Sequence, residues 1–229
     1  EMLHIMTESD EHHRRFEAMK LINGGLKRSL AKCAVQTLYM VAGSNAVEVK
    51  ERAYAHPMEF RNKGNQIPDA VVNTIHAVVE RVGGPLAQRF CRLKAAHLGL
   101  APLRWSDRNA PMPFADSTVV PFDEAVKIVL AAYESFSPAL AELIREMVRM
   151  ERTDAPAVKR KQSGAFNHSF VLPGNVPVSF TFLNYLGSNR DVMTLAHEWG
   201  HGVHGMLAGK EQGPLMSNTP IAYCETASV

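Results

Sequence analysis

The sequence predicts a mainly α-helical fold with one small β element. Apolar residues recur at helical spacing through much of residues 8–150, whereas the run 164–186 shows the alternation and clustering typical of strands. A further amphipathic helical segment follows that run. We therefore expect a helical region over 1–150 and a second region over 151–229, which contains the short strands and two more helices.

The first helical pattern spans residues 8 to about 42, with apolar residues on one side. Gly24 and Gly25 are expected to bend or split this helix, because glycine is a poor helix former. Residues 43–68 contain two glycines and two prolines and predict a short helix between loops.

Asp69 is expected to cap the next helix, which has a valine-rich side and should end at Gly83 and Gly84. Pro85 then predicts the start of another helix, since proline fits the first helical turn. That helix is expected to end near Gly99.

Residues 101–121 carry four prolines and predict a loop, with Trp105 and Phe114 expected to pin it to the core. A clean amphipathic pattern begins at Asp123, and Pro138 restarts the chain into a second one. These two patterns complete the predicted helical region.

Residues 164–186 have a different period, and their apolar residues are typical of strands. They are Phe166, Phe170, Val178, Phe180 and Phe182. Pro173 and Gly174 lie between them and predict a turn. We expect one hairpin or two short strands that lead directly into the next helix.

That next helix has a clear start, because Ser188 and Asp191 have the Ser-x-x-Asp spacing of a capping box. Its apolar side predicts burial, and it comprises Val192, Leu195, Ala196, Trp199 and Val203. Gly200, Gly202 and Gly205 weaken helix propensity by roughly 1 kcal/mol each. Such glycines make sense where another backbone approaches closely.

The same helix contains His-Glu-x-x-His at residues 197–201, a spacing typical of zinc sites. Residues four apart share a helix face, so His197 and His201 can aim at one ion. Glu198 lies beside the first ligand, where its carboxylate can take a proton from metal-bound water. Zinc accepts neutral imidazole readily, which makes one zinc ion the predicted cofactor.

A catalytic zinc needs a third ligand and an open position for water. Glu225 is the candidate, in a segment after Pro220 that reads as the start of a second helix. Glu225 follows His201 by 24 residues, which allows the first helix to end and the chain to turn back. Glycines and prolines between 209 and 220 predict that loop.

The sequence resembles the oligoendopeptidase F branch of the thimet-oligopeptidase-like zinc metallopeptidases. The resemblance rests on His-Glu-Trp-Gly-His-Gly-Val-His at 197–204, Glu225, and Lys-x-Ser-Gly-Ala-Phe at 161–166. Leu-Asn-Tyr at 183–185 and Arg-Asp-Val at 190–192 also fit, and the likeness is most specific over 158–229.

The resemblance implies a zincin-like fold and a zinc endopeptidase that hydrolyses oligopeptides. Zinc held by His197, His201 and Glu225 would activate water, with Glu198 as general base. The resemblance also implies that one strand before the zinc helix pairs with the substrate backbone. The family's transition-state-stabilising His and Tyr residues follow the third ligand, so we expect the chain to be an internal fragment that ends before them at Val229.

Three neighbouring residues are weaker candidates. His204 lies one turn after His201 and is expected to act in the second shell or in packing, because a fourth ligand would close the open position. His168 could face the substrate cleft, although a surface position is expected. Cys224 could ligate zinc chemically, but adjacent helical residues diverge, so only it or Glu225 can face the metal.

Two alternatives remain open from the residues. The chain could be a non-catalytic helical module with structural zinc, in which Cys224 or His204 completes four ligands. It could also be a thermolysin-type zinc peptidase, although the helical upstream half and the 161–166 segment argue against that alternative.

Composition gives no sign of a nucleic-acid or membrane partner. The formal net charge is +2, which produces no strong field. No apolar run reaches the roughly 18 residues that span a bilayer. Three widely spaced cysteines suit a reducing compartment without a disulfide framework. Cysteine usage and the resemblance together predict a cytoplasmic protein with short peptide substrates.

Overall fold

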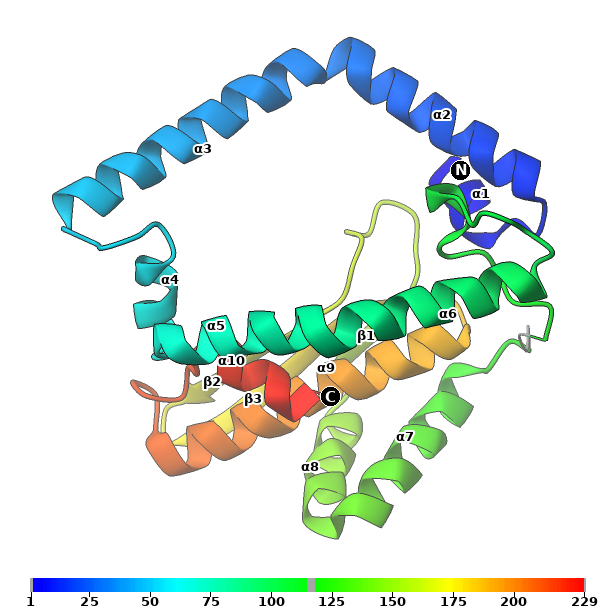
Figure 1. Ribbon diagram of the computed structural model, residues 1–229. Helices are drawn as coiled ribbons and strands as arrows, with labels where there is room; N and C mark the ends of the chain where they lie inside the picture. The colour runs from blue at the N-terminus through cyan, green and yellow to red at the C-terminus, as the bar shows by residue number, and fades with distance from the viewer. Residues whose placement is uncertain (1, 115–117, 229) are drawn as a thin grey trace. The chain divides into compact units, whose positions relative to one another are not determined.

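The computed structural model of the protein describes residues 2–114 and 118–228 (Figure 1). The chain forms two compact units, Glu1–Asp116 and Ser117–Val229. Both units are rich in helix, and the described strands all belong to the second unit, which confirms the mainly α fold class. The sequence pattern assigns the helices over 122–149 to the helical region 1–150. In the structure they belong to the second unit, which carries the strands.

The first unit consists of helices joined by short turns. Its elements are α1 (Met2–Glu8), α2 (His12–Ser29), α3 (Ala31–Glu51), α4 (Glu59–Gly64), α5 (Asp69–Val78), a π-helix (Val79–Gly83), α6 (Gly84–His97) and a 3₁₀ helix (Trp105–Asp107).

The predicted break at Gly24 and Gly25 is wrong. Helix α2 runs through both glycines and ends at Ser29, and Leu30, with φ of −111° and ψ of −15°, separates it from α3. Helix α3 then continues to Glu51 rather than ending near residue 42. Glycine costs helix propensity without forbidding the helical conformation, so neighbouring residues can carry the helix across it.

The predicted helix end at Gly83 and Gly84 is also wrong. Both residues keep helical φ values of −67° and −58°, and a π-helical turn joins α5 to α6 there. Asp69 does not cap α5, whose N-cap is Pro68. Its carboxylate instead accepts a 2.7 Å hydrogen bond from Asn62 Nδ2 and pairs with His56.

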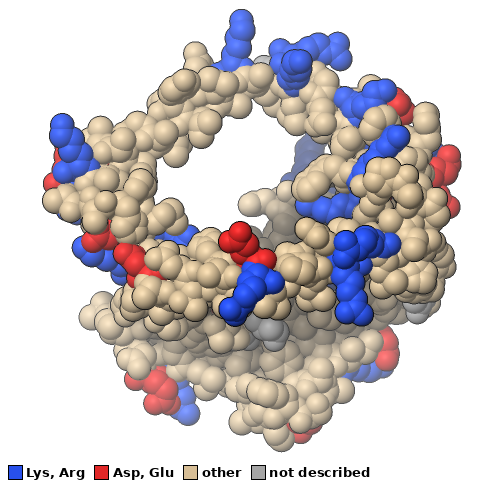
Figure 2. Space-filling model, in the orientation of Figure 1, with Lys and Arg blue, Asp and Glu red and all other residues tan. Residues whose placement is uncertain are grey.

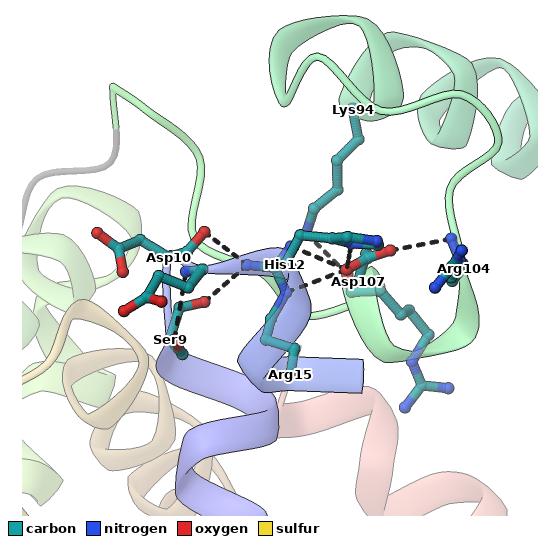
Figure 3. A network of polar contacts seen from close by, with 9 residues as sticks. Ser9, Asp10, His12, Arg15, Lys94, Arg104 and Asp107 are labelled. Carbon is teal, nitrogen blue, oxygen red and sulfur yellow. Dashed lines mark hydrogen bonds and ion pairs between the residues drawn. The ribbon is translucent and has the colours of Figure 1, made fainter. Parts of the chain in front are cut away.

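A buried ion-pair network ties the start of α2 to the 3₁₀ helix (Figure 3). Arg15 donates from Nη2 to Asp107 Oδ1 over 2.8 Å, and His12 Nδ1 lies 2.8 Å from the same oxygen. The other carboxylate oxygen accepts from the Arg104 backbone N–H at 3.1 Å. Burial by itself would raise the pKa of Asp107, but the hydrogen bonds from His12, Arg15 and Arg104 outweigh it and lower that pKa.

Trp105 and Phe114 do not pin the 101–121 loop to the core, because each is 69% exposed. The Trp105 ring instead lies under the Arg108 guanidinium at 4.4 Å, and the Phe114 ring meets the edge of His97 at 5.3 Å. Both aromatic side chains therefore contact surface residues.

The second unit combines helices with a three-stranded sheet. Its elements are α7 (Phe122–Phe136), α8 (Pro138–Arg149), β1 (Thr153–Pro156), β2 (Phe166–Leu172), β3 (Val176–Tyr185), α9 (Asn189–Gln212), α10 (Ile221–Cys224) and a 3₁₀ helix (Glu225–Ser228). The strand order is β1-β3-β2, with β1 parallel and β2 antiparallel to the central β3.

Strands β2 and β3 form the hairpin predicted over 164–186, but the β structure is not confined to it. Strand β1 lies outside that range, and its sequence, Thr-Asp-Ala-Pro, does not alternate apolar and polar residues in the way that predicts a strand. It is held by pairing with β3, including a 2.9 Å hydrogen bond from Thr181 N to Arg152 O. Trp199 Nε1 also donates to Thr153 Oγ1 at 3.2 Å, which anchors β1 to α9.

Helix α9 is the centre of the second unit, with the sheet along one side and α7 and α8 against its apolar side (Figure 1). Its predicted capping box is confirmed: Ser188 Oγ accepts from Asp191 N, and the Asp191 carboxylate accepts from Ser188 N. The core around α9 comprises Ala125, Val129, Ile144, Met147, Ala155, Leu183, Leu195, Trp199, Val203 and Met206.

The glycines of α9 bring it against the hairpin. A Cβ atom on Gly205 would overlap Oγ and Cβ of Ser169, and one on Gly209 would lie 2.9 Å from Pro177 Cβ. One on Gly202 would lie 2.8 Å from Met147 Sδ. Gly202 and Gly205 are therefore sites of close packing, but the nearest atoms belong to side chains rather than to the approaching backbone that was predicted. Gly209 belongs to this helix rather than to the following loop.

The sheet face turned toward these glycines is polar. Asn167 Nδ2 donates to Ser179 Oγ at 2.8 Å and to Thr181 Oγ1 at 3.0 Å, while Ser169 Oγ donates to Asn167 Oδ1 at 3.0 Å. Ser179 and Thr181 are fully buried, so these bonds satisfy groups that water cannot reach. Helix and hairpin thus meet across small, hydrogen-bonded side chains.

Acidic and basic side chains are interspersed among other residues on the face shown in Figure 2. That mixture agrees with the small net charge of +2. None of the helices in the described ranges combines the length and the hydropathy needed to cross a membrane.

Candidate metal centre

Three side chains converge on one point in the second unit. His197 Nε2 and His201 Nε2 each lie 3.7 Å from Glu225 Oε2. One potential ligand atom from each of the three residues lies within 4.8 Å of the others. Among the described residues, this is the one group of three or more His, Cys, Asp or Glu side chains with such a spacing.

Helix α9 places the two imidazoles. They are one helical turn apart, and their ring centroids are separated by 4.7 Å with the planes 84° apart. Residues at i and i+4 project from the same helix face, so both rings reach the same side of α9. The buried apolar side, which includes Leu195 and Trp199, fixes the rotation of the helix and hence the direction of the rings.

Glu225 reaches the same point from the other side of a loop. Helix α9 continues to Gln212, past the predicted loop residue Gly209, and α10 begins directly after Pro220 as expected. Glu225 itself lies at the start of a 3₁₀ helix rather than inside a continuous α-helix. Pro220 at the N-cap has no backbone N–H and cannot lie beyond the first helical turn, which helps to set the start of α10 and hence the position of Glu225.

The segment that carries Glu225 also orients both imidazoles. His197 Nδ1–H donates to the Ser228 backbone oxygen at 2.8 Å, and the His201 ring hydrogen-bonds to the backbone of Cys224. The bond from His197 occupies Nδ1 of its ring, and in both rings Nε2 is the nitrogen that lies near Glu225. Metal-binding histidines in general hold their second nitrogen with such an outer partner.

The distances between the potential ligand atoms fit a zinc ion, and this observation is independent of any sequence motif. Two ligand atoms bonded to one zinc at about 2.0–2.2 Å can be separated by no more than about 4.4 Å. The 3.7 Å separations from Glu225 Oε2 to the two Nε2 atoms satisfy that limit. Two imidazoles and one carboxylate form a donor set found in catalytic zinc sites.

Burial changes the acid–base properties of this cluster. Glu198 is 6% exposed, and desolvation raises the pKa of its carboxyl group. The nearby Glu225 also raises that pKa, whereas His197 lowers it. Burial likewise lowers the pKa of His201, which favours the neutral imidazole that metals bind.

A cavity of about 280 Å³ opens beside the three converging side chains. His201 and Glu225 form part of its wall, together with Asn167, His168 and Ser169 of β2. The remaining lining comprises His204, Gly205, Ser217, Asn218, Thr219, Ile221 and Cys224. The cavity therefore extends from the candidate metal ligands to the outer strand of the sheet.

The weaker candidates of the sequence analysis lie around this cavity but outside the group of three. His204 Nε2 is hydrogen-bonded to Thr219 Oγ1 at 3.2 Å. Cys224 Sγ donates to its own helix at Ile221 O over 3.2 Å. His168 is exposed on β2 and contributes to the cavity wall.

Sequence reasoning missed the residues that orient the ligands. Ser228 accepts from His197 through its backbone oxygen, and its Oγ donates to the Glu225 backbone oxygen at 3.0 Å. Cys224 also acts on His201 through its backbone. Main-chain acceptors have no residue signature, so motif spacing alone could not identify them.

Comparisons with known proteins identify a family and relatives of the chain. The model of peptidase family M3 matches residues 5–229 of the chain. The chain is 25% identical over 226 residues to group B oligopeptidase PepB of Streptococcus agalactiae, covering 98% of this chain and 36% of that protein. It is 24% identical over 213 residues to oligopeptidase PepF of Bacillus subtilis, covering 93% of this chain and 30% of that protein.

Solved structures share the fold. A Bacillus anthracis structure assigned to oligoendopeptidase F superimposes with a TM-score of 0.75 at 20% identity, over 99% of this chain and 42% of that chain. PZ peptidase A, solved with an inhibitor, gives a TM-score of 0.75 at 19% identity, over 99% of this chain and 40% of that one. The chain thus spans about a third of the length of the two curated relatives above.

Proposed function

The chain belongs to peptidase family M3, and from that premise we propose that it carries the metal site of a zinc-dependent endopeptidase that hydrolyses oligopeptides. The observation that carries the proposal is the convergence of His197, His201 and Glu225, with Glu198 buried next to the first of them. The relatives named oligopeptidase support short peptides as the substrate class.

In this proposal His197, His201 and Glu225 hold one zinc ion. Bound zinc would supply Lewis acidity, which lowers the pKa of a coordinated water toward neutrality. The chain's own contribution is to hold the two Nε2 atoms and the Glu225 carboxylate in place through Cys224 and Ser228. Outer-shell bonds of this kind typically change metal affinity by about 10- to 100-fold.

Glu198 is the proposed general base. Its side-chain carboxylate accepts the proton released as water attacks the scissile carbonyl, and then returns that proton to the leaving nitrogen. The desolvation that raises its pKa makes the carboxylate a stronger base. Adjacent residues on a helix diverge, so Glu198 can act on water without replacing His197 as a ligand.

The peptide would bind along β2. This strand forms one edge of the sheet, and three of its residues line the cavity beside the candidate ligands. An unpaired edge offers backbone donors and acceptors to an extended peptide, which adds as a further strand. The resemblance predicted such an edge, and the position of β2 supports it as the strand concerned.

The hydrogen bonds around the site favour a catalytic zinc over a four-ligand structural zinc. A structural zinc would need a fourth protein ligand, with Cys224 or His204 as candidates. Each of these side chains is hydrogen-bonded elsewhere, to Ile221 and Thr219 respectively. Three ligands next to an open cavity suit a site that keeps a position for water.

The test compares Glu198→Gln with Glu211→Gln, an exposed glutamate near the end of the same helix. Both variants are made in the natural polypeptide that contains this chain, loaded with zinc, and assayed with an internally quenched oligopeptide. We expect Glu198→Gln to retain one zinc and lose roughly 10²- to 10⁴-fold in kcat. Glu211→Gln should behave as the unmodified protein. Full turnover by Glu198→Gln, or zinc-independent turnover by the unmodified protein, would refute the proposal.

We also propose a reducing, cytoplasmic environment. Cys33 and Cys91 are exposed free thiols, and Cys224 is a partly exposed one. Exposed thiols without disulfide partners suit a compartment that keeps cysteine reduced. Cell fractionation with an antibody against the natural protein tests this assignment, and recovery among secreted proteins would contradict it.

A further inference from the structure

The outer edge of β2 presents a defined set of backbone groups. Thr181 N of β3 donates to Arg152 O on the β1 side, so the polar backbone groups of Thr181 point away from β2. Asn167 lies opposite Thr181 and therefore belongs to a pair that exchanges no hydrogen bonds. Val171 lies opposite Pro177, which has no N–H to donate, and this fits the same alternation.

The N–H and C=O groups of Asn167, Ser169 and Val171 consequently point out of the sheet. Over residues 2–114 and 118–228, β3 is the one strand that pairs with β2, and no turn or loop bond reaches these three residues. Three alternate residues of an edge strand can pair with an extended segment about five residues long. Asn167 and Ser169 also line the cavity that contains His201 and Glu225.

The side chains of β2 alternate between two different environments. Asn167, Ser169 and Val171 face α9, whereas Phe166, His168 and Phe170 stand on the opposite face of the sheet. We call these last three residues the aromatic row. Phe166 and Phe170 remain 48% and 40% exposed. Their rings stack on Phe182 and Phe180 of β3 at 4.8 and 5.9 Å, which holds the row in place.

The distribution of polar and apolar side chains is the reverse of that in most sheets with one buried face and one solvent-exposed face. Such sheets bury their apolar face and leave polar residues in water. Here the hydrogen-bonded serine, threonine and asparagine side chains are covered by α9, while the aromatic row is exposed. An exposed row of large rings next to an unpaired edge is suited to contact with an added strand.

We propose that a substrate peptide added along β2 lays every second side chain on the aromatic row. The proposal rests on the proposed function and deepens it, because it names the substrate preference. Directly opposite residues in paired strands project to the same face. A peptide residue opposite His168 therefore lies beside Phe166 and Phe170, where an apolar or aromatic side chain is favoured.

The intervening peptide side chains face the cavity instead. A residue opposite Ser169 projects toward the α9 side, where Ser169, His204 and Thr219 form part of a polar wall. Large apolar groups gain little there, and small or polar side chains fit. The protein should therefore prefer apolar residues at every second position of a peptide. Whether these are the odd or the even positions, counted from the scissile bond, we call the parity of the preference.

The first experiment measures this parity with the natural polypeptide loaded with zinc. Two series of internally quenched octapeptides carry Phe, Ser or Lys at one position, which is odd in one series and even in the other. We expect kcat/KM to fall about threefold to tenfold from Phe to Ser in one series only, in line with the worth of an aromatic contact. Equal dependence on both parities, or on neither, would overturn the proposal.

A charged residue introduced into the aromatic row should change which peptide is preferred, and a changed preference is more specific evidence than a loss of activity. Phe170→Glu should reverse the preference at the sensitive position, so that Lys is cleaved faster than Phe. Val176→Ala is the matched control, because Val176 is similarly exposed on the same face but lies on β3 at the end of the hairpin. If Phe170→Glu fails to fold, Phe170→Leu should still weaken the preference for Phe over Ser. A folded Phe170→Glu variant with unchanged preference would refute the proposal.

Hydrogen exchange tests the pairing without turnover. In the Glu198→Gln protein, saturating octapeptide with Phe at the preferred parity should slow exchange at the amides of Asn167, Ser169 and Val171. The amides of His168 and Phe170 already bond to β3 and should change less. Protection elsewhere without protection of these three amides would overturn the pairing. Failure of the proposed function is distinct, since it appears as no zinc-dependent cleavage of any peptide.

Discussion

His197 Nδ1 lies 2.8 Å from the backbone oxygen of Ser228, three residues after Glu225. The loop that supplies the third candidate ligand thus also orients the first one. Because Glu225 and Ser228 belong to one 3₁₀ helix, displacement of that helix would disturb two ligands together. Metal retention is therefore expected to depend on the folding of this short segment as well as on its carboxylate.

Removal of a ligand should release zinc. We expect Glu225→Ala to weaken zinc binding by more than about 100-fold, since even outer-shell partners are worth 10- to 100-fold. His204→Ala is the control, because His204 borders the same cavity but bonds to Thr219. Zinc content after dialysis against a graded chelator measures both variants. Zinc loss from His204→Ala equal to that from Glu225→Ala would indicate a four-ligand structural site.

The contact between α9 and β2 should not tolerate a methyl group. Gly205→Ala places a Cβ against Ser169, and relief of that overlap is expected to cost about 1–3 kcal/mol. Gly84→Ala is the matched control, because its Cβ meets nothing within 4 Å and its φ of −58° is helical. That substitution should stabilise by about 0.5–1 kcal/mol.

Denaturant unfolding of both glycine variants measures the difference. Combining Gly205→Ala with Ser169→Gly should recover part of the lost stability, because the overlapping Oγ and Cβ atoms are removed. Equal stability of Gly205→Ala and Gly84→Ala would show that α9 can move away from the hairpin.

The Asp107 network should make the first unit sensitive to acid. Burial opposes ionisation, but hydrogen bonds from His12, Arg15 and Arg104 hold the folded-state pKa of Asp107 below its ordinary value. A lowered folded pKa contributes stability above the unfolded pKa of about 3.9, and that stability disappears as the pH falls through the folded value. We expect this contribution to be intact near pH 7 and to decrease below about pH 4.

Asp107→Asn tests that dependence. Asp107 has no exposed surface, and Arg15 is 1% exposed. Neutralising one partner leaves the other charge buried, so we expect a loss of about 3–5 kcal/mol near pH 7 that shrinks in acid. Glu51→Gln, at an exposed position, should change stability by less than about 0.5 kcal/mol. A pH-independent difference between Asp107→Asn and the unmodified protein would contradict the ionic role.

The start of α9 should depend on its capping box. Ser188→Ala removes the acceptor for the Asp191 N–H and is expected to cost about 0.5–2 kcal/mol. Ser135→Ala is the control, because Ser135 Oγ donates only to its own helix on an exposed face. Thermal unfolding of the two variants compares them, and an unchanged melting temperature for Ser188→Ala would show that tertiary packing alone starts the helix.

Local signals predicted the elements around the candidate metal centre well. The spacing of Ser188 and Asp191 identified the start of α9, and the His197–His201 spacing identified a shared face. Pro220 located the start of α10. These features depend on neighbours within a few residues, so the sequence alone contains the information that determines them.

Features that depend on distant partners were missed or misplaced. Strand β1 exists because β3 pairs with it, and the residue types Thr-Asp-Ala-Pro show no apolar–polar alternation that would predict a strand. Gly24 and Gly25 reduce helix propensity, yet the surrounding residues keep α2 helical through them. The acceptors for His197 and His201 are backbone groups, which residue identity does not reveal.

The direct contact of Gly205 with Ser169 has a consequence for where a peptide is cut. At Gly205 the short side chain of Ser169 fills the space between the helix that carries His201 and the strand proposed to bind the peptide. If the chain cleaves peptides as proposed, the separation between His201 and the bound peptide backbone is therefore set by this close packing of α9 on β2. Substitutions in the aromatic row should change which peptides are cut, while the cleaved bond keeps a constant offset from the residues that pair with β2.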